Sequence, residues 1–123
     1  RSNMDSGMFY PMQAAATAAM NLGEEWYQAL NATYYSRQAA AYAIMDAIGC
    51  TYTLDQAGLF VWGKLPEGAD DGYAYSDKIL YECGVFITPG GIFGSQGERY
   101  LRISLCAPVE VLEKSLEKIK TRL

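Results

Sequence analysis

A chain of 123 residues, half of them apolar, is long enough to bury the core of a single domain. Its formal net charge of −4 argues against a nucleic-acid surface and against binding to an anionic membrane, both of which need basic faces. The chain has no histidine, which removes histidine-dependent nucleophiles and the common zinc sites. No apolar run approaches the roughly 18 residues that a membrane span needs.

The three cysteines, Cys50, Cys83 and Cys106, are odd in number and widely spaced. This spacing predicts neither a disulfide framework nor a Cys-x-x-Cys metal site. Reduced thiols in a cytoplasmic protein are the expectation, and no secretory signal pattern opens the chain.

Two helices are expected in the first half of the chain. Residues Met12–Leu22 are rich in alanine, the strongest helix former, and Gly23 ends that run. A helix of about 25 residues should follow, from Glu24 until Gly49, because apolar residues recur at steps of three and four. The residues expected to be buried on these helices are Ala15, Ala16, Ala19, Met20, Trp26, Leu30, Tyr34, Ala41, Ile44, Met45 and Ile48.

The second half of the chain alternates short strand patterns with helices. The expected elements are strands at Tyr52–Leu54 and Gly58–Leu65, a helix at Asp77–Cys83 capped by Ser76, strands at Val85–Thr88 and from Tyr100 onward, and an amphipathic helix after Pro108. Short strands without regular β-α alternation predict an α+β fold, in which helices pack on a small antiparallel or mixed sheet. Residues 1–123 are expected to form one domain.

A loop with four glycines separates the last two expected strands, and the second of these strands carries Arg102. Glycine is useful where backbone segments approach closely, so the loop should have a defined shape. Along the strand, Leu101, Ile103 and Leu105 share one face, and Arg102 points to the other. The alternation alone fits a solvated arginine as well as an anion clamp, in which the planar guanidinium holds a carboxylate by two parallel hydrogen bonds.

The run Val85-Phe-Ile-Thr-Pro-Gly-Gly-Ile-Phe-Gly, followed by Gly97-Glu-Arg-Tyr-Leu-Arg102-Ile-Ser, resembles the C-terminal segment of class I/II aminotransferases, which are pyridoxal-phosphate enzymes of fold type I. The segment Gly58-Leu-Phe60-Val-Trp62 and the stretch from residue 2 to residue 15 resemble the same family. The resemblance implies that Arg102 holds the α-carboxylate of the substrate. It implies that Phe60 lies near the substrate, although core packing alone would also explain an aromatic residue there.

The resemblance covers this chain but only the last third of a family member. It implies the C-terminal small domain of an enzyme that moves an amino group between an amino acid and a 2-oxo acid, with a large domain and a second subunit as its partners in a homodimer. The lysine that binds pyridoxal phosphate is expected upstream of Arg1. The chain alone is therefore expected to be inactive, without catalytic, cofactor-binding or metal-binding residues. Exposed apolar surface is expected near Met8, Phe9 and Tyr10.

Two alternatives stay open. Another fold type I enzyme, such as a C–S lyase or a cyclopropane-carboxylate-type synthase, would share this domain and Arg102. A free-standing module with a carboxylate-sized pocket is the other possibility. Residues near the cofactor would separate the enzymes from one another, and the upstream reading frame would test the module.

Overall fold

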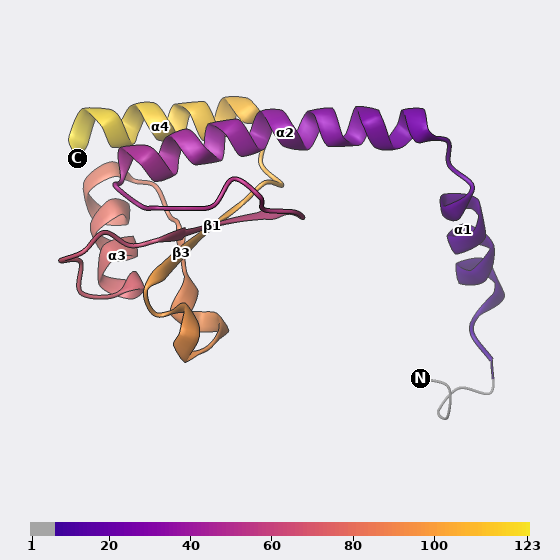
Figure 1. Cartoon of the computed structure of the whole chain (residues 1–123), viewed down its shortest axis with the longest axis horizontal. Helices are drawn as coiled ribbons and strands as arrows, with labels where there is room; N and C mark the ends of the chain where they lie inside the picture. The colour runs from indigo at the N-terminus through magenta and orange to yellow at the C-terminus, as the bar shows by residue number, and fades with distance from the viewer. Residues whose placement is uncertain (1–6) are drawn as a thin grey trace. The chain divides into compact units, whose positions relative to one another are not determined.

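The computed structural model describes residues 7–123 (Figure 1). These residues divide into two compact units, with the boundary between Ala32 and Thr33. Each unit is described by itself. The beginning of the family-like stretch from residue 2 to residue 15 lies outside the described residues.

The first unit contains helix α1, Tyr10–Met20, which has Pro11 in its first turn. Proline is favoured there because its missing N–H would be unpaired in any residue. Every residue of α1 is exposed, so the predicted buried stripe of alanines and Met20 is wrong. Alanine forms a helix by its intrinsic propensity and needs no burial to do so. Met8, Phe9 and Tyr10 are exposed, as expected.

Helix α2, Glu24–Ala47, spans 24 residues, close to the predicted length. Glu24 and Glu25 occupy its first turn, where acidic side chains suit the positive end of the helix dipole. The predicted apolar stripe is buried only in the second half of the helix, at Ala41, Ile44 and Met45. The first-half residues Trp26 and Leu30 are exposed.

The sheet has three antiparallel strands in the order β1-β3-β2: β1 at Phe60–Lys64, β2 at Thr88–Pro89 and β3 at Tyr100–Ser104. The strand predicted at Tyr52–Leu54 is absent, because only Thr51 pairs, in a single bridge to Lys64. The central pairing of β1 with β3 sets Trp62 opposite Arg102.

Helix α3, Gly72–Cys83, begins five residues earlier than predicted. Its N-cap is Asp71, whose Oδ1 accepts a hydrogen bond from the Ala74 N–H at 2.8 Å. The predicted cap, Ser76, is buried inside the helix and donates to the Ile87 carbonyl. Helix α4, Val109–Arg122, follows Pro108 as predicted.

One apolar core joins the sheet to the helices of the second unit. The predicted inward face of β3 is confirmed, since Leu101, Ile103 and Leu105 are all buried. The core residues of the sheet, its flanking loops and the three helices are Ala41, Ile44, Met45, Ile48, Cys50, Val61, Leu65, Ile79, Cys83, Ile87, Leu101, Ile103, Leu105, Leu112 and Ile119. In Figure 1, α4 and the second half of α2 lie on the same side of the sheet. The architecture confirms the predicted α+β class.

Candidate functional site

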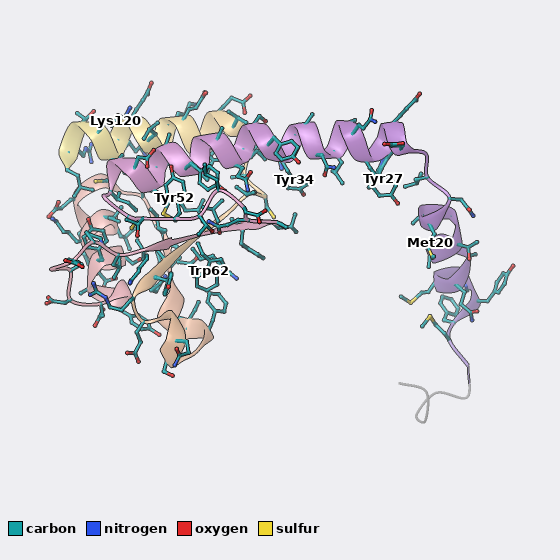
Figure 2. The ribbon with its side chains drawn as sticks, in the orientation of Figure 1. Met20, Tyr27, Tyr34, Tyr52, Trp62 and Lys120 are labelled. Atoms are coloured by element: carbon teal, nitrogen blue, oxygen red, sulfur yellow. The ribbon has the colours of Figure 1, made fainter. Side chains whose placement is uncertain are left out.

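The candidate site lies on the sheet face that points away from the core. Along β1, Val61 and Gly63 are buried, so Phe60, Trp62 and Lys64 take the opposite face. Figure 2 shows Trp62 on the side of the sheet away from α2 and α4. Because Trp62 is paired with Arg102, the guanidinium group emerges on this same face, which we call the open face.

The glycine loop borders the open face and consists of two short 3-10 turns, η1 at Gly90–Phe93 and η2 at Ser95–Gly97. A Cβ atom on Gly97 would overlap the Gly90 carbonyl group. The two turns can therefore lie this close together only because Gly97 has no side chain. Gly94, which joins the turns, has a φ of +124° that other residues rarely adopt. The glycines thus fold the loop on itself and fix the place of Phe93.

Arg102 lies between two aromatic rings. Its Cζ atom is 4.0 Å from the centre of the Phe60 ring and 3.9 Å from the centre of the Phe93 ring. Two rings on the same side of one carbon at these distances would contact each other, and none of the ring contacts of residues 7–123 joins Phe60 to Phe93. The rings therefore lie on opposite sides of the guanidinium group. Trp62 lies beside it, with its ring centre 5.9 Å from Cζ.

One hydrogen-bond donor of Arg102 has no partner among the described residues. Its Nε–H is buried and donates to no acceptor among residues 7–123. Arg99, three residues earlier, donates instead to the backbone carbonyls of Pro66, Ala69 and Asp70. An unpaired buried donor costs about 1–3 kcal/mol, which a fold tolerates where a ligand supplies the missing acceptor. Of the two arginines, Arg102 is the one with a side-chain donor that the described residues leave unpaired.

A groove of about 410 Å³ lies beside Trp62, and Arg102 is not among its lining residues. It is lined by Thr51, Tyr52, Thr53, Gln56, Trp62, Lys64 and Tyr100. The Gln56 side chain pairs with both the N–H and the carbonyl of Trp62, so it completes the outer edge of β1 as a neighbouring strand would. Burial and a hydrogen bond to Asp46 raise the pKa of Tyr52, whose hydroxyl group lies at this groove.

The open face does not fit pyridoxal phosphate as a self-sufficient site. The cofactor requires a lysine for its Schiff base and an acid for its pyridine nitrogen. Lys64 is the one lysine that lines the groove, and no carboxylate lines it among residues 7–123. The same residues contain no group of three His, Cys, Asp or Glu side chains that could hold a metal ion. Their helices also lack the combination of length and apolarity required to cross a bilayer.

Comparison with known proteins decides the family. The family model described as aminotransferase class I and II matches residues 3–119, which is nearly the whole chain. The chain belongs to the class I and II aminotransferases. Among curated relatives, the LL-diaminopimelate aminotransferase of Oleidesulfovibrio alaskensis is 38% identical over 97% of this chain and 30% of its own length. The enzyme of the same name from Desulforudis audaxviator is 34% identical over 98% of this chain and 30% of its own length.

Solved structures of other proteins share the fold. BacF from Bacillus subtilis superposes with a TM-score of 0.74 at 30% identity, over 94% of this chain and 30% of its own. An aminotransferase from Staphylococcus aureus superposes with a TM-score of 0.77 over 98% of this chain and 32% of its own, at 24% identity. The chain thus spans about a third of the length of the relatives and solved structures that it matches.

The structure brings the two sequence-predicted site residues together, since Phe60 stacks on Arg102. Sequence reasoning did not single out Phe93 and Trp62 as members of the site. Trp62 could have been found from its period-two relation to Phe60. Phe93 gave no periodic signal, because it lies in a loop whose path depends on glycine contacts.

Proposed function

We propose that this chain is the C-terminal, carboxylate-binding domain of an enzyme that transfers an amino group between an amino acid and a 2-oxo acid. Pyridoxal phosphate would supply the amino-transfer chemistry and would be held by residues outside this sequence. A large domain and a second subunit would be its partners. The observation that carries the proposal is the position of Arg102, with aromatic cover on both sides and a buried Nε that lacks an acceptor.

Arg102 would bind the α-carboxylate of the amino acid by its planar donor edge. Charge-assisted hydrogen bonds of this kind are about twice as strong as neutral ones, and the two-pronged geometry also orients the ligand. Phe60 would keep water from one side of the pair. The 123-residue chain alone would bind carboxylates weakly and would not transaminate, because the site offers no acid and lysine arrangement for the cofactor.

Among amino acids, diaminopimelate is the first to test, because several curated relatives carry the name LL-diaminopimelate aminotransferase. The second candidate is C–S lyase or synthase chemistry on the same fold, since Arg102 would serve any reaction of an α-amino acid. The names of the relatives favour amino transfer.

Steady-state kinetics of Arg102 variants would test the proposal, in the enzyme expressed from the reading frame that contains this sequence. Arg102→Lys keeps the charge but loses the two-pronged geometry. Losing one charge-assisted bond, at about 1.5–3 kcal/mol, should lower kcat/KM for an amino acid roughly 10- to 150-fold. Arg102→Ala should lower it further. Arg122→Ala, which removes an exposed arginine of α4, is the matched control.

The amine that remains when every carboxylate of the same amino acid is removed supplies the decisive comparison; for diaminopimelate this amine is 1,5-diaminopentane. It lacks the group that Arg102 would hold, so both Arg102 variants should change its turnover little. Equal losses on the amino acid and on the amine would show that Arg102 supports the fold and does not bind the carboxylate. A wild-type enzyme that releases a thiol, ammonia and a 2-oxo acid from one amino acid, without a second 2-oxo acid as amino acceptor, would favour the lyase.

A further inference from the structure

We propose that Phe93, together with Phe60, is a positioning residue that makes Arg102 selective for planar anions over tetrahedral ones. The inference rests on the proposed function, since it concerns how the same arginine recognises its anion. It assigns a role to the glycine loop, because η1 delivers Phe93 to the guanidinium group.

The first step is the confinement of the guanidinium group. Ring centres at 4.0 and 3.9 Å from Cζ, on opposite sides, leave only the in-plane edge of Arg102 open to an anion. Cation–π contacts stabilise this stacked arrangement, and more so where water is excluded. Phe93 is itself held by an edge-on contact with Trp62, with ring centres 5.6 Å apart and planes at 70°.

The second step is the shape of the anion. The two oxygens of a carboxylate lie in one plane with the two N–H groups that bind them. A sulfonate or phosphonate has a third oxygen, which must project out of that plane toward one of the rings. The face of an aromatic ring carries negative charge density and offers no hydrogen-bond donor, so it disfavours an anionic oxygen there. The clamp should therefore reject tetrahedral head groups.

The test uses two inhibitors of equal charge, 3-phenylpropionate and 2-phenylethanesulfonate, which differ in the head group. We expect the wild-type enzyme to bind the carboxylate at least about tenfold more tightly, which corresponds to one misplaced charged hydrogen bond. Phe93→Leu keeps an apolar side chain but removes the ring, and it should bring the ratio of the two inhibition constants close to one. Phe93→Tyr keeps the ring and should keep the ratio. Ile92→Ala, at the exposed neighbouring residue, is the control.

A second measurement does not depend on turnover. In the 123-residue chain, hydrogen exchange of the Arg102 Nε–H, followed by NMR, should quicken in Phe93→Leu and stay slow in Phe93→Tyr. In kinetics, Phe93→Leu should raise KM for the amino acid roughly 5- to 30-fold, the equivalent of one cation–π contact, with little change for the decarboxylated amine.

The outcomes separate the two proposals. Suppose that Arg102→Ala weakens binding of 3-phenylpropionate but Phe93→Leu keeps the wild-type ratio of the two inhibition constants. The proposed selectivity of the two rings is then wrong, and the proposed function of Arg102 stands. If Arg102→Ala leaves 3-phenylpropionate binding unchanged, the proposed function itself fails. If Phe93→Tyr behaves like Phe93→Leu, the ring is not what matters and the inference is wrong.

Discussion

The two faces of strands β1 and β3 have opposite compositions and opposite surroundings. The inner face places Val61, Leu101 and Ile103 in the core, each at most 7% exposed. The outer face, which we have called the open face, carries Phe60 and Arg102 and is bordered by the glycine loop that supplies Phe93. Because successive side chains of a strand point to opposite faces, the ten residues of β1 and β3 supply both sets of side chains.

This difference separates stability from recognition. Burial of apolar area drives folding, so the inner face should dominate the free energy of unfolding. The open face holds aromatic area and a charge that contribute less to folding. It follows that substitutions on one face should change stability and substitutions on the other should change ligand binding.

The largest stability effect is expected at the centre of the inner face. Leu101→Ala removes a fully buried side chain and should lower the free energy of unfolding by about 2–5 kcal/mol. Urea denaturation followed by circular dichroism would measure it. Leu54→Ala, at a residue that is 77% exposed, is the control and should change stability by less than about 0.5 kcal/mol. A loss at Leu101 as small as that would break the comparison.

The next comparison is between the stability effects of two arginines, Arg102 in β3 and Arg99 just before the strand. Arg99→Ala leaves the carbonyls of Pro66, Ala69 and Asp70 without their charged donor, and should cost about 1.5–3 kcal/mol. Arg102→Ala removes an unpaired donor and cation–π contacts of about 0.5–2 kcal/mol, so it should cost less. The two variants should be compared by thermal and urea denaturation. A larger loss at Arg102 would mean that this arginine is a structural residue.

Gly97→Ala tests how the loop sets the open face. The added methyl group would overlap the Gly90 carbonyl, and relief of such overpacking typically costs about 1–3 kcal/mol. The displacement should also carry Phe93 away from Arg102, so carboxylate binding should weaken in the same variant. Ser95→Ala lies in the same loop without this close approach and is the control. Unchanged binding in a destabilised Gly97→Ala protein would show that Phe93 keeps its place independently of the glycines.

The buried thiol of Cys50 should change the free energy of unfolding only in alkaline solution, and not at neutral pH. Burial raises its pKa from an ordinary value of 9.0 to about 11. Between these values the unfolded chain loses the thiol proton while the folded chain keeps it, so stability should fall as pH rises from 9 to 11 and be unaffected below. Denaturation midpoints of wild type and Cys50→Ala across this range would measure the difference. Parallel curves would show that Cys50 does not titrate differently on unfolding.

The same burial predicts an order of thiol reactivity. Cys106 is exposed and Cys50 is buried, and the thiolate is the reactive form. A maleimide at pH 8 should therefore modify Cys106 first, as peptide mass spectrometry would show. Preferential modification of Cys50 would contradict the placement of the inner core.

The sequence predicted the second unit better than the first. Apolar steps located α2 and α4, and alternation located β1 and β3, because a side chain that must be buried leaves a periodic mark in the sequence. The predictions of a strand at Tyr52–Leu54 and of a helix cap at Ser76 were wrong for local reasons. Thr51 alone finds a strand partner, and Asp71 caps the helix first because its carboxylate reaches the N–H of Ala74.

By itself, the sequence determined the α+β class, the family and the identity of the arginine on the outward face of β3. Those properties follow from patterns along the chain. The tertiary structure alone decided that Phe93 faces Phe60 across Arg102, and that Arg99 is satisfied by backbone while the Nε of Arg102 is not. The reason is that both facts depend on contacts between segments distant in sequence. The pairing of β1 with β3 and the folded path of the glycine loop bring these segments together, and no periodicity records either.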